Sequence, residues 1–283
     1  KETGYKTLDG KDVAPIQPGN VWECKEFLAK YEGVSGTQVY GFERFLYQYL
    51  SEEYPGEIQY DTDKIKLWSL DIETSSENGF PKPELAEEEV LLITMKNFRS
   101  KKLITFGSRP YNKTREDVEY IQLLTTFVEW WATVEPEVIT GWNVDGFDIP
   151  FLCNRIRKIG TEKLLNRLSP WAFVKYTMKD NQFGRQVQKY DIAGISIIDY
   201  LDIYKKFTYT NRESYRLDVI AELELGRKKL DHSEFDTFKD FYTNGWDKFV
   251  DYNLVDVDLV DELEEKMKLI DLVMLMAYDA KCN

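Results

Sequence analysis

Histidine is almost absent from this sequence, which has one, His232, among 283 residues. A metal site built mainly from imidazole ligands is therefore excluded. The three cysteines, Cys24, Cys153 and Cys282, are odd in number, widely separated and outside any Cys-x-x-Cys spacing. This pattern argues against a disulfide framework and against a structural zinc site. We expect reduced thiols in a cytosolic protein.

Long apolar runs are also missing, since none approaches the roughly 20 residues that a membrane-spanning helix needs. Nothing at the N-terminus resembles a signal peptide. With 43% hydrophobic and 31% charged residues, the composition predicts a soluble globular protein of the cytoplasm that does not contact a membrane. The chain opens on Lys1 rather than Met and ends on a polar segment, so we expect a piece of a longer protein.

Positive charge is scarce, because 37 Lys and Arg residues face 50 Asp and Glu residues, a net charge of −13. Proteins that bind nucleic-acid phosphates normally use clustered Lys and Arg. Two explanations would reconcile the deficit with nucleic-acid binding. A site for divalent cations needs an excess of carboxylates, and the surface that grips the phosphate backbone can lie on parts of a longer protein.

The first 63 residues are rich in turns and predict a small accessory domain. A helix is expected around Trp22–Lys30, and aromatic, strand-like segments around Val39–Tyr49. The main domain begins with the alternating segment Ile65–Glu73, which predicts a strand.

The remaining elements alternate in type and predict a mixed sheet with helices packed on it, an α/β (α+β) fold. Strands at 89–95 and 102–106 would form an antiparallel meander with the first strand. The pattern then predicts a helix at 116–133, a buried strand at 138–140, a helix that begins near Pro150, a β-hairpin with a glycine turn at 173–192, and helices at 214–225 and from 246 toward 270, the last continued by the apolar residues 272–277.

Asp71 and Glu73 stand two positions apart on the expected first strand, so their side chains leave the same face of the sheet. Two carboxylates on one face repel each other unless a cation lies between them, and Mg²⁺ or Mn²⁺ is the obvious candidate. The alternative is a strand end that simply reaches solvent.

Asp148 lies in a loop between the strand at 138–140 and the following helix, and loops at strand ends are where α/β proteins collect ligands. Asn143 and Phe147 are its neighbours in the same loop. The alternative is that Asp148 is only a helix N-cap, with Pro150 in the first turn.

Tyr252 and Asp256 are four residues apart on an expected helix, which puts the phenol and the carboxylate on one face. A tyrosine hydroxyl there could orient or deprotonate a metal-bound water. The alternative is an ordinary helix with a half-buried tyrosine and a surface aspartate.

The three patterns together, Asp-x-Glu, Asn-x-x-x-Phe-Asp and Tyr-x-x-x-Asp in this order, resemble the motifs of the DEDDy 3′→5′ proofreading exonucleases of family B DNA polymerases. Longer strings, at 141–150, 197–207 and 252–257, are similar to the polymerases of T-even-type bacteriophages. The resemblance implies an RNase H-like exonuclease domain at 64–268, a partial, mainly β N-terminal domain at 1–63, and a helix at 269–283 that returns to the N-terminal domain.

The resemblance also implies two divalent metal ions, Mg²⁺ or Mn²⁺. Asp71, Glu73 and Asp256 would ligate one ion, and Asp71 would share the second, which Asp148 reaches directly or through water. Tyr252 would orient the attacking water.

Lys229 is similar to a lysine that supports the exonuclease site in this family, although the adjacent Arg227 and Lys228 leave the register open and a solvated basic turn is the alternative. A related exonuclease class has histidine in place of the tyrosine. The single histidine, His232, lies far more than five residues before Asp256, so we expect it to be structural.

For DNA contacts, the resemblance implies that Phe147 stacks on the terminal base, that Asn143 holds the strand near the cleavable phosphate, and that Phe80 is a weaker candidate wedge. The hairpin at 173–192 is similar to one that helps separate primer from template, and a plain connecting hairpin is the alternative. The implied partners are the single-stranded 3′ end of a DNA primer, the remaining polymerase domains in the same or a separate chain, and a sliding clamp reached through those domains. A phage-encoded protein would work in the host cytoplasm.

The polymerase motifs of the family, Asp-x-x-Ser-Leu-Tyr-Pro-Ser and Tyr-Gly-Asp-Thr-Asp, are absent from the 283 residues, so we expect no polymerase palm here. Two alternatives stay open. One is a catalytically silent DNA-binding or structural domain, although all four carboxylates are present. The other is a free-standing DEDDy nuclease, since nothing in the residues selects DNA over RNA.

Overall fold

The structure is a computed structural model that describes residues 4–7, 9–40, 45–56, 61–77, 79–112, 115, 118–122, 125–180 and 186–280. The chain divides into two compact units, formed mainly by residues 1–60 and 61–279. Within the described ranges, no helix combines the length and the apolar character that crossing a bilayer requires.

The first unit contains two short antiparallel strands, β1 (Tyr5–Lys6) and β2 (Asp12–Val13), and two helices, α1 (Val21–Tyr31) and α2 (Phe45–Glu53). The prediction of a helix at 22–30 is confirmed. Its start is fixed by a capping box, in which the Asn20 side chain accepts the backbone N–H of Glu23 and the Glu23 carboxylate accepts the backbone N–H of Asn20.

The prediction of strand-like structure up to Tyr49 is wrong for residues 45–49, which open helix α2. The sequence places Leu46, Tyr49 and Leu50 three and four positions apart, and this spacing suits one face of a helix. Aromatic content alone was therefore a poor guide to the secondary structure. Residues 41–44 of the same prediction lie outside the described residues.

The second unit is built on a six-stranded mixed sheet with the spatial order β10-β7-β3-β4-β5-β6. Its strands are β3 (Leu67–Thr74), β4 (Val90–Asn97), β5 (Leu103–Gly107), β6 (Val118–Gln122), β7 (Val138–Gly141) and β10 (Ser196–Asp199), and a 3-10 turn at Thr62–Lys64 precedes them. Strands β3, β4 and β5 pair antiparallel, whereas β7 pairs parallel with both β3 and β10. The predicted meander and the predicted α/β class are confirmed.

The predicted helix at 116–133 is half wrong, because Val118–Gln122 forms strand β6 and only Thr125–Val134 is helical, as α3. Strand β6 pairs parallel with β5 along its whole length, from Leu103 with Val118 to Gly107 with Gln122. The open edge of β5 offers backbone hydrogen bonds to a segment that is rich in β-branched and aromatic residues. The spacing of apolar residues within one segment carries no information about pairing with a distant strand of this kind.

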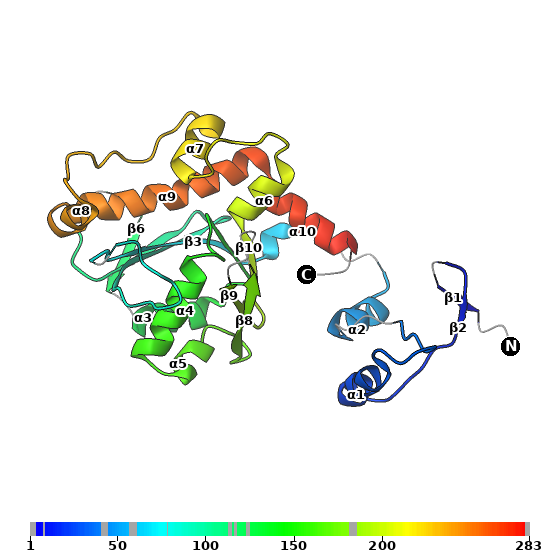
Figure 1. The fold of residues 1–283 in the computed structure, drawn as a ribbon. Helices are drawn as coiled ribbons and strands as arrows, with labels where there is room; N and C mark the ends of the chain where they lie inside the picture. Colours follow the sequence, from blue (N-terminus) through cyan, green and yellow to red (C-terminus); the bar gives the residue numbers. More distant parts are fainter. Residues whose placement is uncertain are drawn as a thin grey trace. The chain divides into compact units, whose positions relative to one another are not determined.

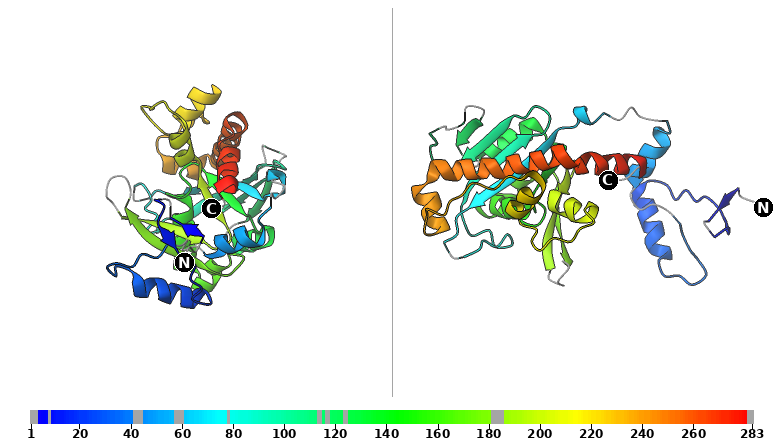
Figure 2. Two further views of the ribbon diagram at one scale, coloured as in Figure 1. Left: turned by 90° about the vertical axis from the view of Figure 1, so that its right-hand side faces the viewer. Right: turned by 90° about the horizontal axis from the view of Figure 1, so that it is seen from above.

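Helices cover both faces of the sheet (Figure 1), as the predicted α/β architecture requires. On one face lie α3, α4 (Asp148–Ile159) and α5 (Glu162–Asn166), and on the other lie α7 (Leu217–Leu225), α8 (Phe238–Asn244) and α9 (Trp246–Met267), with α6 (Tyr200–Phe207) and α10 (Leu269–Ala280) beside the β10 end. Figure 2 shows α9 extending along the sheet and α10 following it end to end.

The expected long C-terminal helix is interrupted at Lys268, whose left-handed φ of 56° closes α9 before α10 begins. The expected hairpin at 173–192 is formed by β8 (Val174–Asp180) and β9 (Gln186–Ile192), which pair antiparallel. Its predicted glycine turn, at 181–185, lies outside the described residues.

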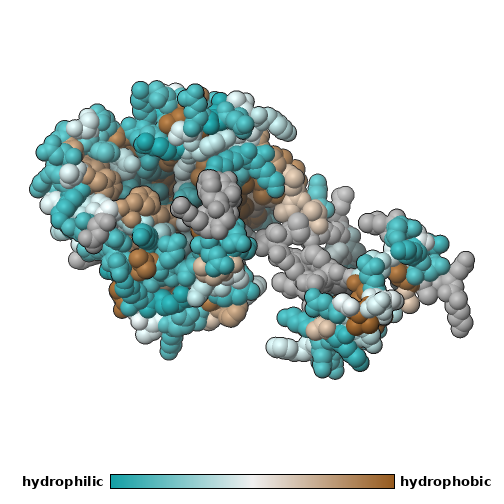
Figure 3. Space-filling model, in the orientation of Figure 1, coloured by the Kyte–Doolittle hydropathy of each residue, from teal (hydrophilic) through white to brown (hydrophobic). Residues whose placement is uncertain are grey.

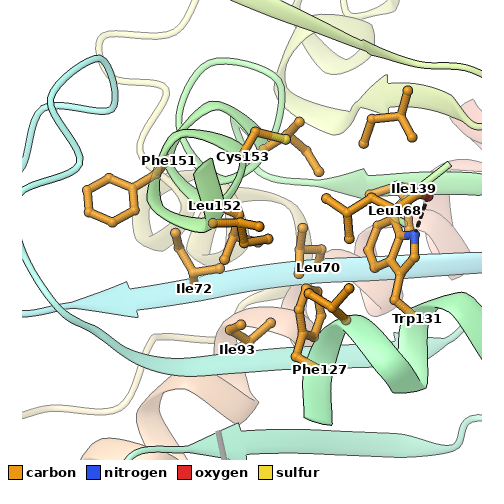
Figure 4. Packing of buried hydrophobic residues seen from close by; sticks show 14 of the residues in the cluster. Leu70, Ile72, Ile93, Phe127, Trp131, Ile139, Phe151, Leu152, Cys153 and Leu168 are labelled. Carbon is orange, nitrogen blue, oxygen red and sulfur yellow. Dashed lines mark hydrogen bonds between the residues drawn. The ribbon is translucent and has the colours of Figure 1, made fainter. Parts of the chain in front are cut away.

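Strand β3 divides its side chains between the two helical layers, because successive residues of a strand point to opposite faces. Trp68, Leu70 and Ile72 belong to the apolar cluster that includes residues of α3 and α4. Figure 4 shows Leu70 and Ile72 on the side of the strand where Phe151 and Leu152 lie. The intervening residues, among them Asp71 and Glu73, therefore face α9.

The apolar side chains on both sides of the sheet are enclosed by polar ones. On the face of the second unit seen in Figure 3, hydrophilic residues cover most of the surface and apolar residues are scattered among them. Two buried clusters lie on the α9 side of the sheet, one of which contains Leu91, Leu92, Leu254 and Val257. The site residues on β3 thus stand on a strand that is fixed from both sides.

Replacement of Leu70, which is 1% exposed, by Ala should lower the free energy of unfolding by about 2–5 kcal/mol, because it leaves a cavity between the sheet and α4. The matched control is Leu223→Ala on α7, at a position that is 57% exposed, where we expect a change within about 0.5 kcal/mol. Urea denaturation followed by circular dichroism measures both. Equal losses in the two variants would contradict this description of the core.

Candidate active site

Three carboxylates from distant parts of the chain meet on the α9 face of the sheet. Asp71 and Glu73 come from β3, Asp256 comes from α9, and one ligand oxygen of each lies within 4.8 Å of the other two. Asp256 is buried, and the two β3 carboxylates are partly exposed. The same-face geometry that the sequence predicts for Asp71 and Glu73 is present, and α9 adds a third acid rather than leaving them in open solvent.

The chemistry of this cluster suits a hard divalent cation. Carboxylate oxygens are the ligands that Mg²⁺ and Mn²⁺ prefer. Asp256 Oδ1 is buried and has no hydrogen-bond partner among the described residues. A buried carboxylate oxygen without a partner is costly, and coordination of a cation would satisfy it.

Burial and mutual repulsion raise the pKa values of the cluster. Burial raises the pKa of Asp71 well above its usual range, and the charge of Asp256 raises it further. The pKa of Glu73 is likewise raised well above its usual range by burial and then by the charge of Asp71. The site therefore resists holding all its negative charge without a compensating cation.

Asp148 approaches the cluster from the other side of β3. It is the first residue of α4, is 3% exposed, and its Oδ1 accepts the backbone N–H of Ile72 at 3.0 Å. The N-cap alternative is wrong, because Phe147 occupies the cap position without a side-chain cap bond and Pro150 is the third helical residue. Burial, followed by the charge of Asp71, raises the pKa of Asp148 well above its usual range, so the two acids interact.

Lys229 supplies the positive charge beside the cluster. Its Nζ donates to Asp256 Oδ2 at 2.5 Å and to the Tyr252 hydroxyl at 3.3 Å. The neighbouring Arg227 and Lys228 pair instead with glutamates on α9 and α7, so Lys229 is the one of these three basic residues that lies beside the cluster, and it is not part of a solvated turn. Burial alone would lower the pKa of Lys229, but the charge of Asp256, the hydrogen bond to it and the neighbouring Tyr252 and Asp71 together outweigh burial and raise the pKa, so the ammonium stays charged.

Tyr252 lies on the same face of α9 as Asp256, as the four-residue spacing predicts. Burial, reinforced by the charge of Asp256, raises the pKa of its phenol above the usual range. At neutral pH the hydroxyl is therefore protonated, and it can orient a neighbouring water by hydrogen bonding rather than act as a phenolate base. The alternative of a surface aspartate at 256 is wrong, since that residue is 4% exposed.

His232 packs against the aromatic side chains under the site. Its ring stacks on Phe241 with centroids 4.9 Å apart and lies nearly perpendicular to the Tyr252 ring, with centroids 5.5 Å apart. Aromatic contacts of this kind fix ring orientation. The contacts agree with the structural role expected for His232, whose ring packs against the ring of Tyr252.

The three residues expected to touch DNA lie around Asp148. Phe80 is 83% exposed, and its ring centroid is 5.6 Å from that of the partly buried Phe147. Asn143 is exposed and has a left-handed φ of 66°, and its backbone N–H donates to the Asp199 carboxylate at 3.1 Å. The structure thus brings the two phenylalanines into contact and places Asn143 at the turn that precedes them.

Two polar residues of the site were missed at the level of sequence. Asn253, which is fully buried, donates from Nδ2 to Asp71 Oδ2 at 2.6 Å. Asp199 accepts the backbone N–H groups of Asn143, Asp145 and Leu201, and so fixes the loop that leads to Asp148. Asn253 could have been recognised from the sequence, because it is a polar residue inside the expected helix and stands three positions before the candidate ligand Asp256, on the same helix face.

Comparison with known proteins gives a consistent picture. Residues 42–220 match the family model described as DNA polymerase family B, exonuclease domain. The chain is 30% identical to the DNA-directed DNA polymerase of Escherichia phage RB69 and 28% identical to that of Enterobacteria phage T4, over 99% of this chain and 34% of each phage protein. It is also 30% identical to the DNA polymerase catalytic subunit of human herpesvirus 7, over 57% of this chain and 17% of the viral protein.

The chain thus spans about a third of the length of the phage relatives. Asp71, Glu73 and Asp148 lie inside the segment matched by the family model, whereas Tyr252 and Asp256 lie beyond it and within the longer phage alignments.

Asp71→Asn should raise the thermal unfolding midpoint by a few degrees at pH 8 in buffer with a chelator, because it removes one of three mutually repelling acids. A carboxyl group whose pKa is raised by folding stabilises the protein below its unfolded pKa, and this stability is lost as the pH rises through the folded pKa. The advantage of the variant should therefore shrink as the pH falls from 8 toward 4.

Differential scanning calorimetry across this pH range measures the effect. The matched control is Asp236→Asn at an exposed position, which should follow the wild type. A lower midpoint for Asp71→Asn than for the wild type at pH 8 would show that repulsion does not dominate the site.

Proposed function

The chain belongs to the exonuclease-domain family of family B DNA polymerases, and on that premise we propose that it is the 3′→5′ proofreading exonuclease part of a phage-type DNA-directed DNA polymerase. It would hydrolyse the terminal phosphodiester at the 3′ end of a DNA strand. The observation that carries the proposal is the convergence of Asp71, Glu73 and Asp256, with ligand oxygens within 4.8 Å of one another.

The proposed cofactors are two divalent ions, Mg²⁺ or Mn²⁺. Asp71, Glu73 and Asp256 would hold one ion, and Asp71 and Asp148 would hold the second, directly or through water. When bound, such ions supply Lewis-acid activation of water and stabilise the charge on the departing 3′ oxygen. The buried Asp256 Oδ1, which has no hydrogen-bond partner among the described residues, supports this assignment.

Tyr252 would orient the attacking water. Lys229 donates to the phenol oxygen, so the phenol proton is left to be donated elsewhere. The raised pKa of Tyr252 keeps this proton in place at neutral pH. Lys229 would also hold Asp256 through its 2.5 Å bond to Oδ2, and so leave Oδ1 for the cation.

Phe147 and Phe80 would receive the 3′ end of the strand. Stacking on an aromatic ring accepts any base, which suits an enzyme that removes whatever nucleotide is last. The large exposed fraction of Phe80, at 83%, and its contact with Phe147 support this role. Asn143, exposed at the preceding turn, would hold the strand near the phosphate to be cut.

The remaining polymerase domains, in the same chain or a separate one, would supply most of the grip on DNA. A net charge of −13 provides little attraction for phosphates outside the metal site. The phage relatives are about three times as long as the chain, which covers 34% of each. A sliding clamp would be reached through those other domains.

Asp71→Ala should abolish Mg²⁺-dependent degradation of 3′-labelled single-stranded DNA in a single-turnover assay, because it removes the ligand expected to serve both ions. Tyr252→Phe should slow the reaction by about 10²-fold, as expected for loss of a group that orients the nucleophile. Its matched control is Tyr209→Phe, since Tyr209 is fully exposed at 102% and should not affect the rate.

Three outcomes would overturn the proposal. Equal degradation by the wild type and Asp71→Ala would show that the carboxylate cluster does not catalyse the cleavage. No degradation by the wild type with either Mg²⁺ or Mn²⁺ would identify a catalytically silent domain. Faster degradation of RNA than of DNA would instead point to a free-standing nuclease of different substrate class.

A further inference from the structure

We propose that Asn253 is a positioning residue that fixes the Asp71 carboxylate for cation binding, at the end of a buried hydrogen-bond chain that begins at Thr105 and passes through Thr94. The proposal rests on the proposed function in one respect, since it takes Asp71 as a cation ligand. The sequence pattern that predicts the site assigns no role to any of these three residues.

The sheet register sets the chain of residues in one row. Asp71 on β3 is paired with Thr94 on β4, and Thr94 is paired with Thr105 on β5. Directly paired residues of neighbouring strands point to the same face of a sheet. All three side chains therefore face α9, which carries Asn253.

The hydrogen bonds run along this row without interruption. The hydroxyl groups of Thr105 and Thr94 are 3.0 Å apart, and the Thr94 hydroxyl donates to Asn253 Oδ1. Asn253 Nδ2 then donates to Asp71 Oδ2 at 2.6 Å. Because Thr94 donates its proton to Asn253, the Thr94–Thr105 bond must be donated by Thr105, and every donor in the row points toward Asp71.

The carboxylate at the end of the row determines the orientation of the amide, because a carboxylate can only accept hydrogen bonds. Asn253, Thr94 and Thr105 are all 0% exposed, so no solvent can replace a lost partner. If the amide turned over, its carbonyl oxygen would face the Asp71 carboxylate, and two acceptors would meet without a proton between them. Asp71 therefore selects the orientation of the amide, and the Thr94 hydroxyl holds the amide in place through its bond to Asn253 Oδ1.

An amide suits this position better than a charged side chain. A lysine would neutralise Asp71 and compete with a cation, and an aspartate would add another negative charge to a cluster that already repels itself. The amide donates a hydrogen bond and leaves the charge of Asp71 available. With Oδ2 held, rotation of the Asp71 carboxylate would break its bond to the fully buried Asn253, so the carboxylate is preorganised for its ligand.

Helix α9 supplies both the ligand and its support. Asn253 and Asp256 are three residues apart and so lie on one face of the helix, above β3. Any movement of α9 that shifts Asp256 also moves Asn253, and with it the Asp71 carboxylate. The three carboxylates of the cluster thus come from two elements only, helix α9 on one side and strand β3 on the other.

The test is calorimetric titration of Mn²⁺ into the 283-residue protein and its variants, without DNA, so that binding is measured apart from catalysis. Asn253→Leu should weaken Mn²⁺ binding by about 10- to 100-fold, the usual effect of removing a residue that orients a metal ligand. Thr94→Val, which removes the bond that holds the amide oxygen of Asn253, should weaken Mn²⁺ binding by roughly 10-fold. Thr94→Ser keeps the hydroxyl and should restore binding to within about 2-fold of the wild type.

The matched control is Thr140→Val on β7. Thr140 is 0% exposed, and its hydroxyl has no hydrogen-bond partner among the described residues. This change removes a buried hydroxyl from the same sheet outside the row, and Mn²⁺ affinity should not change. If Asn253→Leu does not fold, as judged by circular dichroism, the positioning role is tested by the Mn²⁺ affinities of Thr94→Val, Thr94→Ser and Thr140→Val alone.

The outcomes separate this proposal from the nuclease proposal. Wild-type affinity in folded Asn253→Leu and Thr94→Val would overturn the positioning role and leave the nuclease proposal standing. The expected order of Mn²⁺ affinities in a protein that degrades no DNA would support the positioning role and overturn the nuclease proposal. A wild-type protein that binds no Mn²⁺ would overturn both.

Discussion

The alternation of side chains along β3 is the constraint on which the rest of the second unit depends. Leu70 and Ile72 enter the apolar cluster of α3 and α4, while Asp71 and Glu73 face α9. One strand therefore anchors the fold with half of its residues and presents acids with the other half. A slip of one residue in register would turn the two acids toward α4 and the apolar residues toward α9, so the fold and the site cannot be separated.

The negative charge of these acids is only partly balanced by neighbouring positive groups, and the remaining negative charge favours binding of a cation. Lys229 binds one oxygen of Asp256 and offsets a single negative charge. Asn253 and Tyr252 contribute hydrogen bonds without charge, since the raised pKa of the tyrosine keeps it neutral. The excess of carboxylates over ammonium groups leaves a local negative potential that an added cation would offset.

Short-range periodicity predicted much of this arrangement. A two-residue step placed Asp71 and Glu73 on one face, and a four-residue step placed Tyr252 beside Asp256, because both spacings follow from the geometry of a single element. The rest depends on how elements meet. The choice of Lys229 over its two basic neighbours, the bond from Ile72 to Asp148, and the pairing of β6 with β5 all join segments far apart in the chain.

The distance along the chain between the two halves of the site also orders its assembly in time. Asn253 and Asp71 are 182 positions apart, so β3 leaves the ribosome long before α9 is made. Until then the nascent chain holds Asp71 and Glu73 without their third acid, their amide partner or the tyrosine. Synthesis proceeds from the N-terminus, so the complete site forms only in a chain that has already produced almost the whole second unit.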